Sequence, residues 1–222
     1  MLRAAFSAAV CSAALVTAVA IPAAIADAAE NIAPVKIVAL GDSLTAGYGL
    51  PEREGFVPRL RAALAAKGLV AEIVNAGVSG DTASGGLARL DWSVPDGTNA
   101  VILELGANDM LRGLDPQVAH AALDAILGRL KDRHIAVLLC GMRAAPNLGG
   151  PYSQSFGRIY SELAGKYGVL LYPFFLDGVA ADASLNQHDG LHPNAAGVGV
   201  IVARILPKVE ELIARVRADR GT

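Results

Sequence analysis

Five short apolar runs constrain the fold of this chain more than any other feature of its sequence. They alternate with longer segments that carry helix signals, and they are nearly continuous in apolar residues, as strands are when both faces of a parallel sheet are covered. We therefore predict an α/β fold with roughly five parallel strands between two layers of helices. The runs are Val35–Leu40, Val70–Asn75, Ala100–Leu105, Ile135–Cys140 and Val169–Tyr172.

The segments between these runs have recognisable helix ends. Residues 56–67 form a helix candidate that stops before a glycine, and Asp115-Pro116 opens a second that runs to about Arg133, with proline in the first turn where its missing N–H costs nothing. A third covers residues 153–167. Asn194 is expected to cap a last helix to about Val216, with Pro207 kinking or interrupting it.

Residues 1–26 have the pattern of a secretory signal peptide. Arg3 is the only charged side chain, and Ala24-Ile25-Ala26 forms a small-x-small cleavage site. We expect cleavage after Ala26, with cleavage after Ala29 as the alternative, and one domain over residues 27–222. The uncharged segment from Ala4 to Ala26 is also long enough to be an uncleaved membrane anchor, but we favour cleavage. The expected location is therefore exported, periplasmic or secreted, with no stable membrane insertion after cleavage.

Charge and cysteine content narrow the function further. Removal of Arg3 with the leader leaves 18 basic side chains, one fewer than the 19 of the full chain, against 21 acidic ones. This mildly acidic balance argues against nucleic acid as a partner, which would need a basic stripe. Cys140 would be the one cysteine left, so no intramolecular disulfide is expected. It ends an apolar run and is interpreted as a small buried hydrophobe.

Polar residues cluster after the ends of the predicted strands. Ser43 follows the first strand, Gly80 the second and Asn108 the third, while Asp189 and His192 follow the last at a distance. Because the carboxyl ends of parallel strands meet at one edge of a sheet, these residues should converge there.

Acyl transfer is the chemistry that these residue types allow. Ser43 needs an adjacent base, His192 can take and return its proton, and a carboxylate must orient the imidazole. Asp189 lies three residues before His192, so a single turn can bring the two together. The backbone N–H groups of Ser43 and Gly80 and the Asn108 side-chain amide can supply three donors for an oxyanion.

Other interpretations of these residues remain. Gly80 and Asn108 each alone would be read as ordinary turn residues, and their joint occurrence at strand ends argues otherwise. His188, Asp189 and His192 could instead bind a metal, but no further His or Cys joins them. The aromatic side chains of Trp92, Tyr152 and Phe156 are interpreted as packing residues and not as substrate-binding ones.

The four segments resemble the four blocks of the SGNH (GDSL) hydrolase family, in order and with sensible spacing. They are Gly41-Asp42-Ser43-Leu44, Gly80-Asp81-Thr82, Gly106-Ala107-Asn108-Asp109 and Asp189-Gly190-Leu191-His192-Pro193-Asn194. Residues 80–90 and 104–113 are also similar to the bacterial thioesterase I / lysophospholipase / arylesterase branch, and the likeness covers nearly all of residues 35–213. The Gly-x-Ser-x-Gly elbow of the α/β-hydrolases is absent, since Thr45 stands at its second glycine.

The resemblance implies a flavodoxin-like three-layer α/β/α fold and a serine esterase. Ser43, Asp189 and His192 would be catalytic, Ser43, Gly80 and Asn108 would form the oxyanion hole, and no metal or other cofactor would be required. The expected substrates are carboxylic esters or thioesters, such as aryl esters, acyl-CoA or lysophospholipid. A polysaccharide deacetylase-type esterase, or a non-catalytic binding module on this fold, are the alternatives.

Overall fold

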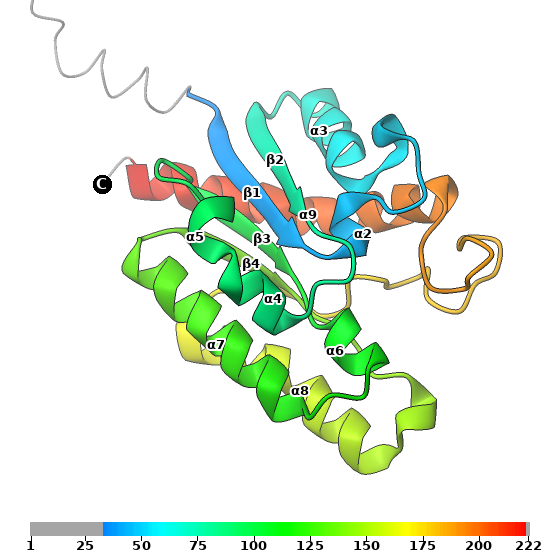
Figure 1. Ribbon diagram of the computed structural model, residues 1–222. Coiled ribbons are helices and arrows are strands. Elements are labelled where there is room, and N and C mark those ends of the chain that lie inside the picture. The colour runs from blue at the N-terminus through cyan, green and yellow to red at the C-terminus, as the bar shows by residue number, and fades with distance from the viewer. Residues whose placement is uncertain (1–32, 221–222) are drawn as a thin grey trace, which may run out of the picture.

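The computed structural model describes residues 33–220 and contains one parallel five-stranded sheet with the order β2-β1-β3-β4-β5 (Figure 1). This is the flavodoxin-like order, and the predicted strands are confirmed to within one or two residues at each end. The strands are β1 (Val35–Gly41), β2 (Ala71–Gly77), β3 (Ala100–Glu104), β4 (Ala136–Cys140) and β5 (Leu170–Tyr172).

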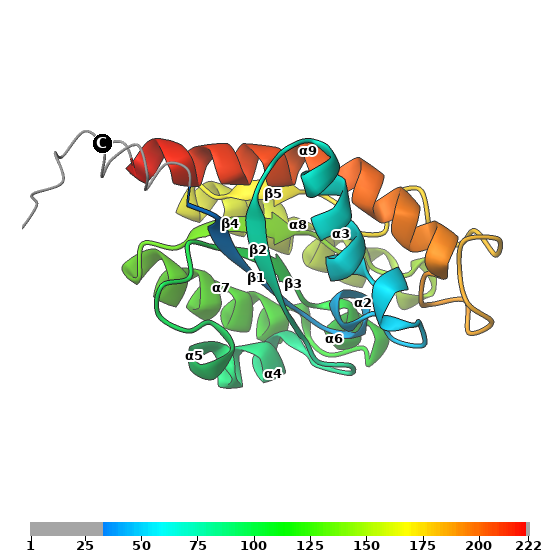
Figure 2. The same ribbon diagram turned by 90° about the horizontal axis from the view of Figure 1, so that it is seen from above.

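Helices cover both faces of this sheet, as the apolar strands predict (Figure 2). On one face α3 packs against α9, and on the other α4 and α8 pack against α7. The helices are α2 (Ser43–Ala46), α3 (Phe56–Ala66), α4 (Ala83–Ala88), α5 (Leu90–Ser93), α6 (Ala107–Leu111), α7 (Pro116–Asp132), α8 (Gly150–Tyr167) and α9 (Ala195–Arg220), with short 3₁₀ turns η1 (Glu52–Glu54) and η2 (Pro146–Leu148).

The strand order reverses between β1 and β3, the two strands that meet at the centre of the sheet. Gly41, the last residue of β1, is level with Gly77 of β2 on one side and with Glu104 of β3 on the other. In open α/β sheets the crevice beyond such a reversal is where ligands bind. The loops that leave β1 and β3 there lead to Ser43 and Asn108.

The last helix differs from the prediction. α9 continues through Pro207 to Arg220, four residues beyond the expected end, although Figure 2 shows its axis changing direction along its length. Proline removes one backbone hydrogen bond, but Ile205 and Val209 on either side of it are both fully buried. The apolar stripe therefore holds the helix together across the proline.

Two further expectations concern the termini and the cysteine. The predicted signal peptide, residues 1–26, and its cleavage site lie outside the described residues. From residue 33 to residue 220, no helix has the length and apolarity needed to cross a membrane. Cys140 is fully buried, as predicted for a core residue.

Candidate active site

Ser43 is the first residue of α2, immediately after the end of β1. Asp42 caps this helix, with its Oδ1 accepting a hydrogen bond of 3.0 Å from the Leu44 N–H. The preceding Gly41 must lack a side chain, because a Cβ there would collide with the Thr45 hydroxyl and with Glu104. The sequence Gly-Asp-Ser thus gives the tight turn that presents Ser43 at the sheet edge.

A closed loop at residues 186–194, here called the acid–base loop, carries the candidate acid and base. Asn186 and Pro193 form an antiparallel bridge at its neck, and the Gln187 N–H donates to the His192 carbonyl at 2.7 Å. Gln187 also donates through Nε2 to the carbonyl of Tyr48 at 2.8 Å. The loop is therefore shaped by its own hydrogen bonds and attached to the segment that follows Ser43.

Asp189, His192 and Ser43 form a continuous chain of hydrogen bonds. Asp189 Oδ2 lies 2.6 Å from His192 Nδ1, and His192 Nε2 lies 3.0 Å from Ser43 Oγ. A neutral imidazole with its proton on Nδ1 fits this arrangement, because Nε2 is then free to accept from the serine hydroxyl. The side chain of Tyr48 packs against the His192 ring, with ring centroids 4.6 Å apart.

The Asp189 carboxyl group is stabilised in its charged form. Its Oδ1 accepts from the backbone N–H groups of His192 at 3.0 Å and Leu191 at 2.9 Å. These two bonds, with the His192 side chain, lower the pKa of Asp189 to about 2. Asp189 is therefore ionised throughout the neutral range and can hold the histidine tautomer.

The two backbone N–H groups predicted for the oxyanion hole are free to bind a ligand oxygen. Within residues 33–220, the N–H groups of Ser43 and Gly80 have no protein acceptor. Gly80 has φ of +86°, a conformation that strains other residues, and its carbonyl accepts from Arg112 at 2.7 Å. The arginine thus holds the Gly80 peptide, which lies beyond the end of β2.

Asn108, near the start of α6, has a more constrained amide than the sequence predicts. Its Nδ2 donates both to Asp42 Oδ2 at 3.0 Å and to the Asp81 carbonyl at 2.9 Å. Both amide hydrogens have protein acceptors, so an oxyanion could bind only by sharing one of them. Whatever its role in catalysis, Asn108 connects the turn after β1, through Asp42, with the loop after β2, through Asp81.

Arg89 connects the ends of the strands that carry these groups. Its guanidinium group donates to the carbonyls of Gly41 and Ala76, each at 2.8 Å, and to Asp81 Oδ2 at 2.5 Å. Arg89 is buried. One side chain therefore joins the carboxyl ends of β1 and β2 to Asp81, the residue after Gly80.

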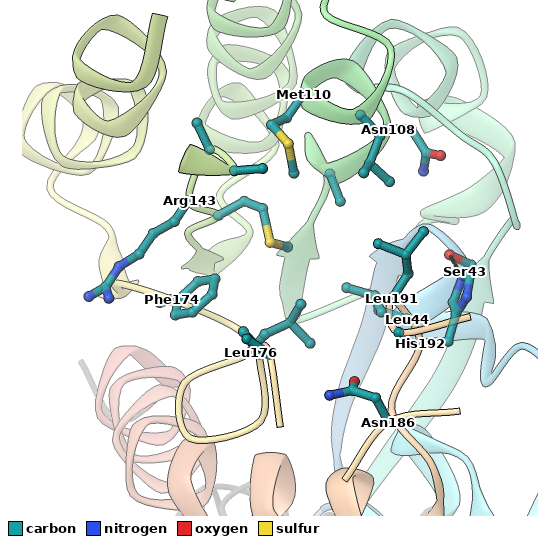
Figure 3. Close-up of a pocket in the computed structure, with 18 residues that line it drawn as sticks. Ser43, Leu44, Asn108, Met110, Arg143, Phe174, Leu176, Asn186, Leu191 and His192 are labelled. Carbon is teal, nitrogen blue, oxygen red and sulfur yellow. Dashed lines mark hydrogen bonds between the residues drawn. The ribbon is translucent and has the colours of Figure 1, made fainter. Parts of the chain in front are cut away.

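A cavity of about 400 Å³ opens beside Ser43, within the range of small-molecule sites (Figure 3). Ser43 and His192 lie together at one end, while Phe174 and Arg143 lie at the other. Most of the wall between them is apolar, including Leu44, Ala107, Met110, Leu111, Met142, Ala144, Ala145, Leu176, Ala180, Ala181 and Leu191. An apolar group attached to a carbonyl at Ser43 would fit this cavity.

Two fully buried carboxyl groups, Asp42 and Glu104, lie under the Ser43 turn. Burial is the main cause that raises the pKa of Asp42 to about 6 and the pKa of Glu104 well above its usual value. Sequence reasoning missed Glu104, although a single charge near the end of the apolar run 100–105 is a usable signal.

The structure connects most of the residues that the sequence singled out for acyl transfer, and Gly80 precedes Asp81, whose carbonyl accepts from Asn108. Ser43, Asp189 and His192 are in direct contact, and Asn108 contacts Asp42 beside Ser43. His188 is exposed. In the described part of the chain, no group of three or more His, Cys, Asp or Glu side chains is arranged to bind a metal ion.

Comparisons with known proteins give a consistent result. Residues 39–200 match the model of the GDSL-like lipase/acylhydrolase family. The arylesterase of Vibrio mimicus is 40% identical over 74% of this chain and 83% of its own, and thioesterase 1/protease 1/lysophospholipase L1 of Escherichia coli strain K12 is 38% identical over 71% and 75%. The solved structure of AlinE4, an SGNH-hydrolase family esterase, is 46% identical, with a TM-score of 0.69 over 81% of this chain and 96% of that one.

Proposed function

This chain belongs to the GDSL-like lipase/acylhydrolase family and is a serine ester hydrolase, and on that premise we propose that Ser43 is its nucleophile. The observation that carries the proposal is the Asp189–His192–Ser43 chain of hydrogen bonds at 2.6 and 3.0 Å. A nucleophile, a base and an orienting carboxylate within hydrogen-bond reach are the arrangement that activates a serine hydroxyl.

In the first half of the reaction, Ser43 Oγ attacks the carbonyl carbon of the ester. His192 Nε2 takes the hydroxyl proton, and Asp189 stabilises the imidazolium ion that forms. When the tetrahedral intermediate collapses, the bond to the alcohol or thiol breaks, and His192 gives the proton to this leaving group. The products of this half are an acyl-enzyme on Ser43 and a free alcohol or thiol.

The oxyanion of the intermediate would bind the N–H groups of Ser43 and Gly80, with the Asn108 amide as a shared third donor. The two backbone groups are free in the described structure, which supports this role. Each such donor is typically worth roughly 3–4 kcal/mol in the transition state.

In the second half, a water molecule takes the place of the leaving group. His192 removes a proton from this water while the water oxygen attacks the acyl carbon. It then gives the proton to Ser43 Oγ as the carboxylic acid is released. The histidine is unprotonated at the start and end of the cycle, so no other group need supply or remove a proton.

The substrate class follows from the cavity beside Ser43. Its largely apolar wall supports an acyl group longer than acetyl, attached to an aryl alcohol, coenzyme A or a lysophospholipid headgroup. The names of the relatives, arylesterase and thioesterase/lysophospholipase, support the same range. Kinetics on aryl esters, acyl-CoAs, lysophospholipids and an acetylated polysaccharide, each at varied acyl length where possible, would rank these classes. A preference for the polysaccharide would contradict the proposal.

Covalent labelling tests the nucleophile directly. A fluorophosphonate probe should label the wild-type protein once per chain, and mass spectrometry of the digest should place the adduct on Ser43. Ser43→Ala should take no label, and heat-unfolded wild type provides the control for non-specific reaction. Labelling at another residue would overturn the assignment.

We further propose that the protein acts after export, with residues 1–26 removed. The leader pattern, with Arg3 and the Ala24-Ile25-Ala26 site, supports this. N-terminal sequencing of the protein released from the cell envelope should begin at Asp27. A sequence that begins at Met1 would contradict cleavage.

A further inference from the structure

The buried carboxyl pair, Asp42 and Glu104, is not explained by the hydrolytic steps above. Both residues are 0% exposed, and Glu104 Oε2 accepts from the Thr45 hydroxyl at 2.8 Å and from the Asp42 N–H at 3.4 Å. The charge of Asp42 is, after burial, the main cause that raises the pKa of Glu104. Two carboxyl groups so close together and away from water cannot both ionise without a large cost.

Asp42 links this pair to the reacting centre. Its Oδ1 accepts from the Leu44 N–H at 3.0 Å, and its Oδ2 accepts from Asn108 Nδ2, also at 3.0 Å. One oxygen therefore fixes the turn that carries Ser43, and the other fixes the amide that faces the same site. Both interactions are strongest when Asp42 is anionic, because hydrogen bonds to a charged acceptor are roughly twice as strong as neutral ones.

The surroundings of Glu104 favour its neutral form. Besides Asp42, the titratable groups that act on it or are affected by it are Cys140, level with it on β4, and Tyr160 of α8; neither is a cation. Arg89 is the buried cation beside the pair, but its guanidinium group donates to Asp81, Ser93 and the carbonyls of Gly41 and Ala76, and to neither of the two carboxyl groups. In the described structure Glu104 Oε1 is buried without a hydrogen-bond donor. A proton on Glu104 would let this carboxyl group donate to Asp42.

We infer that Glu104 is a protonated positioning residue, which donates to an anionic Asp42 and so holds the Asn108 amide and the Ser43 turn in place for catalysis. The inference rests on the proposed roles of Ser43 and Asn108. A protonated Glu104 can donate a hydrogen bond to the Asp42 carboxylate, so that both buried carboxyl groups have partners. An ionised Glu104 would instead place a second negative charge beside Asp42.

Two substitutions at one position test the inference. Glu104→Gln keeps a neutral group that can donate to Asp42 and accept from Thr45, so its kcat should fall by less than about threefold. Glu104→Met has a similar volume but no polar atoms to hold Asp42, so its kcat should fall by about 10–100-fold with KM changed by less than about threefold. Equal losses in the two variants, or a wild-type kcat in Glu104→Met, would overturn the inference.

Two controls separate positioning from simple loss of stability and from failure of the proposed function. Tyr160→Phe removes another buried hydrogen bond, 2.9 Å long to the Leu105 carbonyl, without contacting Asp42 or Asn108. It should lower the melting temperature with little effect on kcat. Full activity in Ser43→Ala would overturn both the proposed function and the inference, whereas an inactive Ser43→Ala beside an unimpaired Glu104→Met would overturn the inference alone.

A spectroscopic measurement covers the case in which Glu104→Met does not fold. Infrared spectra of wild type at pH 8 should contain the C=O band of a protonated carboxylic acid in a folded protein. Subtraction of the Glu104→Gln spectrum should assign that band to Glu104. Wild type and Glu104→Gln spectra with the same carboxylic-acid bands would show that Glu104 is ionised, and would overturn the inference.

Discussion

Two carboxyl groups are connected to the Ser43 turn, Asp189 of the acid–base loop through His192 and Asp42, beneath the turn, through the Leu44 N–H. The side chain of Asp189 is 38% exposed, and backbone N–H groups lower its pKa to about 2. Asp42 is 0% exposed, and burial raises its pKa to about 6 although it also accepts two hydrogen bonds. Both carboxyl groups accept hydrogen bonds, yet the exposed one has a lowered pKa and the buried one a raised pKa, so burial decides the direction of the shift.

The partners of these two carboxyl groups also differ in their separation along the sequence. Asp189 is fixed by residues two and three positions along the chain. Asp42 is fixed on one side by Glu104 and Asn108, which are 62 and 66 residues away. Changes in the acid–base loop should thus affect chemistry with little effect on stability, and changes beneath the turn should affect both.

The largest effect is expected where the two sides meet. Ser43→Ala removes the nucleophile that both support, and in a serine protease such a change costs about 10⁶-fold in kcat. We expect a loss of at least about 10⁵-fold on an aryl ester, with a melting temperature near that of wild type, because within residues 33–220 Ser43 Oγ has only His192 as a hydrogen-bond partner. Substantial turnover by the folded variant would exclude Ser43.

Asp189→Asn tests the acid–base loop alone. The asparagine oxygen can still accept from the loop backbone, but its NH₂ would face His192 Nδ1 and favour the tautomer with a proton on Nε2. That tautomer cannot accept from Ser43, so kcat should fall by about 10⁴-fold. The melting temperature should change little at pH 7. A small kcat effect with a large loss of stability would reverse the comparison.

Asn108→Ala tests the side beneath the turn, and should lower kcat by roughly 10²–10³-fold with little change in KM. Because its amide also braces Asp42 and Asp81, the melting temperature should fall as well. Asn75→Ala is a matched control, since Asn75 also braces a loop, accepting from the Gly77 N–H at the end of β2. Equal kcat losses in both variants would assign Asn108 a bracing role only.

The pH dependence of stability should have opposite signs on the two sides. Asp189 has a lowered folded pKa, so its contribution is present above pH 3.8 and is lost as pH falls toward 2; its exposure makes the effect small. Asp42 has a raised folded pKa, so its own contribution to stability is fully present below pH 3.8 and is lost as pH rises through 6.

Melting curves from pH 3 to pH 8 measure these signs. The melting temperature of wild type minus that of Asp42→Asn should increase by a few degrees as pH falls from 7 to 5, since about 1 kcal/mol shifts the melting temperature by about 2–4 °C. Relative to Asp189→Asn, wild type should lose melting temperature only below about pH 4. The same sign for both pairs would contradict the assigned pKa shifts.

The smallest effect is expected from a chelator. His188, Asp189 and His192 are the residues that a metal site on the acid–base loop would use, and Asp189 and His192 are instead bonded to each other. Dialysis against EDTA should leave kcat within error of the untreated protein. Loss of activity that added zinc restores would replace the serine mechanism with a metal-dependent one.

The sheet could be predicted because each strand is a buried apolar run, and the long helices because their ends carry caps or glycines. The short helices α4, α5 and α6 were not predicted, since four to six residues show too little periodicity. The interpretation of Trp92 as a packing residue was wrong, as it is 72% exposed. In α5 the buried residues are Leu90 and Ser93, one turn apart, and the two positions between them face solvent.

The contacts of the site also include some that could be predicted from the sequence and some that could not. The pairing of Asp189 with His192 could be predicted because three positions along a turn bring the side chains together. The contact between Asp42 and Glu104 depends on the register of β1 with β3, which sequence periodicity does not specify. The hydrogen bond from Gln187 to Tyr48 could not be predicted either, because it joins segments 139 residues apart.

The acid–base loop also has a consequence for how the chain folds. Its internal bonds span at most eight residues, so the Asp189–His192 pair can form by local closure, within the time in which short loops close. The bond from His192 to Ser43 joins positions 149 residues apart and needs β1 and the end of the chain to be assembled on the same sheet. Contacts of such separation form slowly. During refolding, the return of esterase activity should therefore lag behind the return of helical circular dichroism, and would time the last long-range step.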